Sequence, residues 1–461
     1  MQRPRHLEGR RWNYTPTPIF DITVMRHFPF IMSRALLLFL PLWILPCAIA
    51  RGQEASPIRS SKIEAALRED PTRACVNTHS YEFLPLYDTP APKGYKPVYI
   101  SHYGRHGSRS DWGRPAYKTV IDALSKGKEA HILTPSGDSL LQEATLVYEG
   151  HDGMDGRLTQ RGVNEHMLIA QRMYTRYRRV FTKGSGKVRS VSSTVPRCLV
   201  SMTAFTDALT KMEPNLDITW DTGENFMAYI NNGCPDSLSK AADALIRSKI
   251  PAPGKGEGER FLGKVFTDPV KGEELVGNKD AFVGLVLHTA RNSNAFDINP
   301  TPFRFLSLDA IYSYYENNAM NLYLHQCNSA EFGKVRTALC RPLVEDIVNK
   351  ANDALGNGRV CADLRFGHDY PILSLFAFIG LQGAGDCLTL DEARTEWFAT
   401  EYVPFASNLQ MIFYRKGNDP SKVLVKFLVN EKETLVPALK AVSGPYYDWN
   451  EVVAYLDGRF R

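Results

Sequence analysis

Apolar and β-branched residues gather in five short runs along the chain. Each run holds five to seven residues and is bounded by polar or turn-forming residues. Short runs of this kind are typical of β-strands. We therefore expect strands of one sheet at 97–101, 187–192, 362–366, 409–414 and 423–429.

Helical spacing dominates the middle of the chain. Residues 308–324 and 335–355 predict helices, and a Pro/Gly-rich loop at 251–258 interrupts the block. The pattern predicts an α/β fold in which a sheet core, flanked by helices, carries an inserted and mainly helical cap. We expect core segments at 51–206 and 358–461, a cap at 207–357, and a further excursion from the first core segment near 115–147.

Two arginines bracket a histidine directly after the first predicted strand. Arg105 and Arg109 flank His106, and Gly107 allows the backbone a close approach. A guanidinium group matches phosphate oxygens bidentately, and a histidine among such groups can attack phosphorus with a ring nitrogen. The motif predicts a phosphoryl site, with an exposed basic turn as the structural alternative.

A second histidine follows another predicted strand. His368 and Asp369 come after 362–366 and precede a helix-like apolar stretch at 372–381. In isolation this pair is more typical of a helix start, at which Asp369 accepts backbone N–H bonds.

A third junction has the same layout. The strand at 187–192 leads to Pro196 and Arg197 in the first turn of a predicted helix, where a solvated helix face is the alternative for Arg197. Ligand crevices in α/β sheets lie at the carboxyl ends of strands, and helix N-termini favour anions. We therefore expect the three junctions to form one anion pocket.

These motifs resemble those of the histidine acid phosphatases, the branch of the histidine phosphatase superfamily that includes phytases and multiple inositol polyphosphate phosphatases. The R-H-G-x-R motif of that family, its later arginine and its H-D pair are matched here, as are its G-x-L-T-x-x-G turn at 156–162 and a late segment at 403–408. The chain has Asp111 where the family often has a proline. It also has H-D where the inositol polyphosphate phosphatases commonly have H-A-E, which favours the acid phosphatase and phytase arrangement.

The resemblance implies a phosphoglycerate-mutase-like core and a mechanism without metal or cofactor. His106 is the implied nucleophile, which forms a phosphohistidine, and Asp369 the implied proton donor. The implied phosphate-binding residues are Arg105, Arg109, Arg197 and His368. Nearby guanidinium charge lowers the pKa of a histidine, which is consistent with activity in mild acid.

The excess positive charge belongs to the N-terminus. Residues 1–51 hold seven Arg and two acidic residues, and the remaining chain has 48 basic and 48 acidic side chains. This balance gives no support for nucleic-acid binding. Residues 32–50 show the charged start, apolar stretch and small-residue exit of a signal peptide, too short and proline-broken for a membrane span. We expect translation to start at Met32 and the mature protein to be periplasmic or secreted, without a stable membrane span.

The cysteines are consistent with export but define no metal site. Cys47 lies in the predicted leader, where a lipoprotein attachment is the weaker alternative. Seven cysteines remain, so at least one thiol is unpaired; Cys327 and Cys340 are close enough in sequence to pair. The chain has neither C-x-x-C nor H-E-x-x-H, which disfavours a zinc site.

We interpret the chain as an exported phosphomonoesterase for small organic phosphates, with inositol phosphates as the leading candidates. A phosphotransferase or mutase of the same superfamily is one alternative, although export disfavours it. A phosphate-ester binding protein without catalysis is another. The presence of both His106 and Asp369 argues against mere binding, which requires neither a nucleophile nor an acid.

Overall fold

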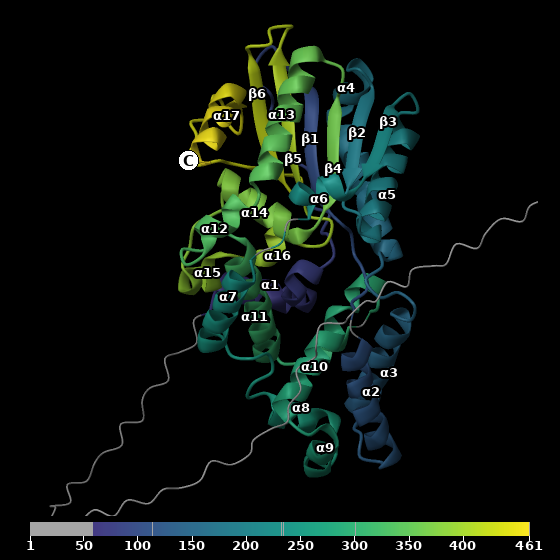
Figure 1. The fold of residues 1–461 in the computed structure, drawn as a ribbon. Helices are drawn as coiled ribbons and strands as arrows, with labels where there is room; N and C mark the ends of the chain where they lie inside the picture. The colour runs from purple at the N-terminus through teal and green to yellow at the C-terminus, as the bar shows by residue number, and fades with distance from the viewer. Residues whose placement is uncertain (1–58, 113, 232, 234, 300, 461) are drawn as a thin grey trace, which may run out of the picture. The chain divides into compact units, whose positions relative to one another are not determined.

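A mixed sheet of eight strands lies at the centre of the computed structural model, which describes residues 59–112, 114–231, 233, 235–299 and 301–460 (Figure 1). Its order is β3-β2-β4-β1-β5-β6-β7, and β8 pairs with β6. Strands β3, β2, β4 and β1 are parallel, whereas β5 to β8 add antiparallel pairs. The strands are β1 Tyr95–Arg105, β2 Lys187–Ser192, β3 Asp217–Thr222, β4 Ala362–Gly367, β5 Asn408–Lys416, β6 Val423–Val429, β7 Lys432–Thr434 and β8 Tyr447–Asp448. All five predicted strands are present, and the predicted class, a sheet core flanked by helices, is confirmed.

Helices cover both faces of the central strands, as is usual for parallel strands. Ile100 of β1 belongs to the core that includes α4 (Gln160–Lys183) and α5 (Pro196–Met212). Tyr99 belongs to the opposite core, with α13 (Arg341–Asn357). Alternate residues of a strand point to opposite faces, so β1 contributes to both cores.

The predicted excursion near 115–147 is a pair of helices that joins helices from the inserted block. Helices α2 (Arg114–Glu129) and α3 (Pro135–Gly150) pack against α8 (Gly258–Val265) and α10 (Lys279–Arg291), with α9 (Pro269–Val276) beside α2 (Figure 1). Segments more than 100 residues apart in sequence therefore share one helical layer.

Helix α11 (Leu308–Gln326) connects this layer to the rest of the chain by packing against α10, α7 and η1. The remaining elements are α1 Ser61–Glu69, η1 Pro71–Thr78, α6 Glu224–Ile230, α7 Asp236–Lys249, η2 Asn294–Phe296, η3 Pro302–Phe305, α12 Gly333–Ala338, α14 Asp369–Ile379, α15 Leu390–Glu396, α16 Ala399–Tyr402 and α17 Trp449–Gly458.

The structure differs from the sequence analysis inside 207–357. This block was expected to be helical, but it contributes β3 to the sheet, and α5 runs through its expected start. The helix predicted at 335–355 is two helices, α12 and α13, because Pro342 lacks an N–H and fits the first turn of a new helix.

Cys327 and Cys340, which are close enough in sequence to pair, are both buried free thiols in the structure. The predicted leader, with Met32 and Cys47, lies outside the described residues. No helix among the described residues has the length and apolar character needed to cross a membrane.

Candidate active site

Three neighbouring strands bring the six predicted site residues to one edge of the sheet. β1 and β2 lie on either side of β4, all three parallel, with Arg105 opposite Gly367 and Ser192 opposite Phe366. The six side chains follow from the ends of these strands: Arg105 ends β1, His106 and Arg109 follow it, His368 and Asp369 follow β4, and Arg197 lies in the first turn of the helix after β2.

The loop after β1 is held by the turn at 156–162. A Cβ atom on Gly107 would lie 2.5 Å from the carbonyl oxygen of Gly162, so only glycine fits there. The Ser108 backbone N–H and hydroxyl both donate to the buried Glu165 carboxylate, each at 2.7 Å. The two segments therefore fix each other, which aims the residues on either side of Gly107.

His106 is buried and electrically neutral. Its Nδ1–H donates to the Gly107 carbonyl oxygen at 3.0 Å, which leaves the lone pair on Nε2. Burial first, and then the charges of Arg105, Arg197 and Arg109, lower the pKa of His106 well below its usual value. An unprotonated Nε2 is the form required of a nucleophile.

Each of the three arginines has a donor that the protein does not use. The Nε groups of Arg105, Arg109 and Arg197 are buried and have no hydrogen-bond partner. Burial, followed by the like charges of Arg197 and Arg105, lowers the pKa of Arg109 to about 10, so it stays charged. Unpaired buried donors and crowded positive charge are both unfavourable, and an anion with several oxygens would relieve both costs.

The Trp112 ring contacts two of these arginines. The guanidinium carbons of Arg109 and Arg197 lie 5.5 and 5.2 Å from its ring centroid. Trp112 is 58% exposed, so the stacked group lies at the protein surface. A ring face attracts cations without occupying their N–H groups, so this contact leaves the donors of both arginines free.

Asp111, the residue that departs from the family pattern, joins the loop after β1 to α10. Its Oδ2 lies 2.6 Å from Arg291 Nη2 and accepts from Asn292 Nδ2 at 3.2 Å. His288 Nε2 lies 3.2 Å from the same oxygen. Burial opposes ionisation of Asp111, but His288 and Arg291 outweigh it and hold its pKa far below the usual range. Where the family often has a rigid proline, this chain therefore has a carboxylate that forms ionic contacts with two residues of α10.

His368 lies beside Arg197. Its Nε2 lies 3.0 Å from the Ser193 hydroxyl, and its Nδ1 lies 3.5 Å from Arg197 Nη2. Burial and then the charge of Arg197 lower the pKa of His368 to about 4. The two histidine rings, His106 and His368, have centroids 5.8 Å apart.

Asp369 is a carboxylate held by two donors. Its Oδ2 lies 3.1 Å from Arg105 Nη2 and accepts from Asn77 Nδ2 at 2.8 Å. Burial favours the neutral acid, but Arg105 and the Asn77 hydrogen bond outweigh it and lower the pKa of Asp369.

Three residues of the site were not predicted from the sequence: Asn77, Trp112 and Glu165. Asn77 lies in η1, well before the arginine-histidine motif, and Glu165 lies within a helix that carries many charges. Neither has a spacing that indicates a site. Trp112 lies close to the motif in sequence, and this proximity was the one signal that could have indicated a role in the site.

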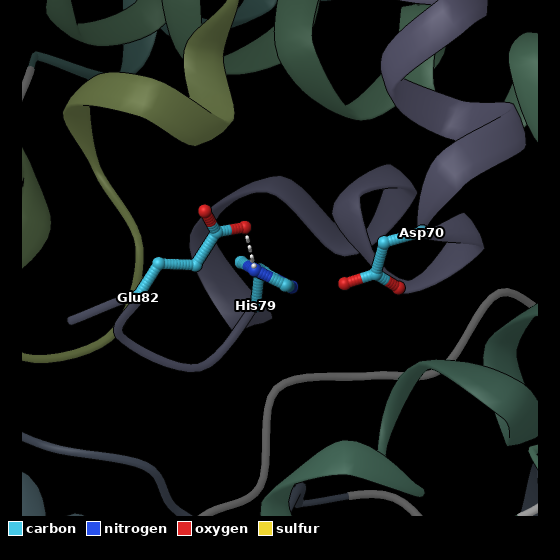
Figure 2. A group of neighbouring side chains, drawn as sticks. All are labelled: Asp70, His79 and Glu82. Carbon is cyan, nitrogen blue, oxygen red and sulfur yellow. Dashed lines mark hydrogen bonds and ion pairs between the residues drawn. The ribbon is translucent and has the colours of Figure 1, made fainter. Parts of the chain in front are cut away.

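A separate group, Asp70, His79 and Glu82, has ligand atoms within 4.8 Å of one another (Figure 2). His79 Nε2 lies 3.0 Å from Glu82 Oε1, and its Nδ1 lies 3.2 Å from the Thr72 hydroxyl. Asp70 caps η1 through the Thr72 N–H, and Glu82 also accepts from Arg73. Figure 2 shows the two carboxylates on either side of the His79 ring. These contacts account for every group as a structural network that ties η1 to the chain after it.

The chain matches the family model of the histidine phosphatase superfamily (branch 2) over residues 104–430. No curated protein matches it in sequence. Among solved structures it is similar to the Bifidobacterium longum multiple inositol polyphosphate phosphatase in complex with phosphate, with 16% identity, a TM-score of 0.66, and coverage of 84% of this chain and 98% of the other. It is also similar to the phytase from D. castellii, with 14% identity, a TM-score of 0.62, and coverage of 89% of both chains. At these identities the similarity establishes the fold.

Proposed function

Because this chain belongs to branch 2 of the histidine phosphatase superfamily, we propose that it hydrolyses phosphomonoesters through a phosphohistidine on His106. The observation that carries the proposal is the neutral imidazole, with its lone pair on Nε2, among three arginines whose buried Nε groups have no hydrogen-bond partner. Nε2 attacks phosphorus as the ester P–O bond breaks, and the alkoxide leaves with a proton. Water then attacks the phosphohistidine, which releases inorganic phosphate and restores His106.

The positive charge that the transition state needs comes from side chains. Arg105, Arg109 and Arg197 supply donors to the phosphoryl oxygens, and His368 lies beside Arg197. Charge stabilisation by preorganised donors in a buried site is a major source of rate acceleration. We infer that the reaction requires no metal ion.

Asp369 is the proposed proton donor. It is a carboxylate in this structure because Arg105 and Asn77 stabilise its negative charge. A phosphoryl group that engages Arg105 and brings its own negative charge would raise the pKa of Asp369. Asp369 would then take up a proton with the substrate, donate it to the alkoxide, and accept one from water in the second step.

We propose small organic phosphates as substrates, with inositol phosphates such as phytate first. Support comes from the similarity to structures named as a multiple inositol polyphosphate phosphatase and a phytase. Export to the periplasm or the medium is part of the proposal and is supported by the signal-like sequence at 32–50. N-terminal sequencing of the native protein near Arg51 tests it.

The decisive experiment compares wild type, His106→Ala and His131→Ala on phytate, sugar phosphates, nucleotides and an aryl phosphate. His131 is an exposed histidine away from the site and serves as the matched control. We expect His106→Ala to lose more than about a thousandfold in rate and the control to lose little. Acid-quenched trapping of ³²P on the wild type, and its passage to water or to an added alcohol, separates a hydrolase from a transferase. Near-normal phosphate release by folded His106→Ala would refute the mechanism.

A further inference from the structure

Asn77 follows a backbone conformation that L residues rarely adopt. Val76, a fully buried β-branched residue, has φ 51° and ψ −109°. Such a conformation is an outlier for a β-branched side chain and persists only where surrounding contacts impose it. The Thr78 hydroxyl donates to the Cys75 carbonyl oxygen at 2.9 Å, and the Thr400 hydroxyl donates to the Arg73 carbonyl oxygen at 2.7 Å. The turn is therefore fixed on both sides of Val76.

The strained turn places both polar groups of Asn77 in the active site. Its carbonyl oxygen accepts from Arg105 Nη1, and its side-chain amide donates to Asp369 Oδ2 at 2.8 Å. Arg105 is 1% exposed and also donates to the Val403 carbonyl oxygen at 3.0 Å. One residue thus contacts the arginine next to the nucleophile and the carboxylate opposite it.

We propose that Asn77 is a positioning residue that sets the orientation and ionisation of Asp369, so that η1 completes the active site. The inference rests on the proposed function, since it concerns the acid of that reaction. Residue 77 precedes the part of the chain that the family model matches, 104–430, so the contribution belongs to a segment outside that match.

The expected effect on pH dependence has a definite sign. A donated N–H favours the carboxylate, so its removal raises the pKa of Asp369. The other titratable or charged groups that face Asp369 are Arg105, His368, Arg109, Tyr103, Tyr370 and Cys198. All of these residues are the same in wild type and in the Asn77 variants, so a difference in the pKa of Asp369 between the proteins reports on Asn77. If Asp369 donates the proton, kcat falls as Asp369 ionises in the substrate complex, and a higher pKa moves that decline to higher pH.

The test measures kcat against pH for wild type, Asn77→Ala, Asn77→Asp and the control Asn294→Ala. Asn294 also makes one side-chain hydrogen bond to η1, to Thr72 at 3.3 Å, away from the site. We expect the upper limb of the profile to move up by about one pH unit in Asn77→Ala, since hydrogen bonds to charged groups are of that order. Asn77→Asp adds a charge at nearly constant shape and should move the limb at least as far, whereas the control should not move it.

A second measurement does not depend on turnover. The ¹³C carboxyl signal of Asp369, identified by its loss in Asp369→Asn, should titrate at higher pH in Asn77→Asp and Asn77→Ala than in wild type. Unchanged pH limbs and an unchanged carboxyl titration would overturn the role of Asn77 while the phosphatase activity stands. A wild type without activity on any phosphomonoester, but with the shifted titration, would overturn the proposed function and leave the positioning role supported.

Discussion

Two buried histidines, one in β1 and one in the helix α4 that packs on it, should make the fold sensitive to acid. His102 lies in β1 and His166 in α4, and each is 1% exposed. The rings of both pack against Phe205 and Phe366. Burial lowers the pKa of both histidines to about 3.

The sign and size of the effect follow from linkage. In the unfolded chain these histidines titrate near 6.5, so between about pH 6.5 and 3 the unfolded chain binds protons that the folded protein does not. Stability contributed by the neutral rings is present above that range and is lost as the pH falls through it. On acidification from pH 7 to 5, each histidine lowers the free energy of unfolding by about 2 kcal/mol, and the pair lowers it by about 4 kcal/mol. This loss is a large share of the free energy of unfolding of a folded domain, which is usually about 5–15 kcal/mol.

Urea unfolding of wild type, His166→Phe and His131→Ala at pH 7 and pH 5 measures this cost. Phenylalanine keeps an aromatic ring among the same neighbours and has no titrating group. We expect the loss of unfolding free energy on acidification to be smaller by about 2 kcal/mol in His166→Phe than in wild type. The exposed-histidine control should behave as wild type. His106 and His368 also titrate, but they are common to all three proteins and cancel in the comparison.

A second variant protects the test against a packing defect. His166→Gln keeps a polar side chain that does not titrate, and it should show the same reduced loss even if its stability at pH 7 is lower. Equal losses between pH 7 and 5 in wild type and both variants would refute the reasoning. If the reasoning holds, the acid limit of phosphatase activity should follow unfolding and not the ionisation of the neutral nucleophile.

Three further outcomes are expected of the site itself. Asp369→Asn should lose about 10²- to 10⁴-fold in kcat on an alkyl phosphate and far less on p-nitrophenyl phosphate, whose phenolate leaves without a proton; equal losses would assign Asp369 to dephosphorylation instead. Trp112→Ala should raise KM and the inhibition constant of inorganic phosphate about tenfold, and Trp112→Phe should restore both, because two cation–π contacts order the arginines. Activity should survive EDTA and be inhibited by vanadate, whereas loss in EDTA with rescue by zinc or magnesium would indicate a metallophosphatase.

The parts of the fold that depend on local pattern could be predicted from the sequence. Short apolar and β-branched runs bounded by polar residues mark five of the strands, and Pro196 marks a helix start directly. Strand β3 was missed for the opposite reason. It is an edge strand in which only Ile218 is buried, so it has no apolar run that distinguishes it from its surroundings.

The contacts that orient the site could not be read in the same way. Asn77 and Asp369 are 292 positions apart, and Ser108 and Glu165 are 57 apart. Single polar residues in contact across such separations leave no periodicity along the chain. The departure at Asp111 was visible in sequence, but its meaning depends on Arg291, which reaches it from a helix of the inserted block.

The way in which the arginines are held leaves their charge available to a phosphate. Arg105 is held by carbonyl oxygens as well as by Asp369, and Arg109 donates to the Ser110 carbonyl oxygen at 2.8 Å. Asp111 Oδ1 lies 3.9 Å from Arg109 Nη1, whereas Asp111 Oδ2 lies 2.6 Å from Arg291 Nη2. Arg291 therefore balances most of the negative charge of Asp111. Carbonyl oxygens and ring faces orient a guanidinium group without cancelling its charge. Asp369 pairs closely with Arg105 and Asp111 pairs mainly with Arg291, so the three arginines keep an excess of positive charge, which suits a phosphoryl dianion.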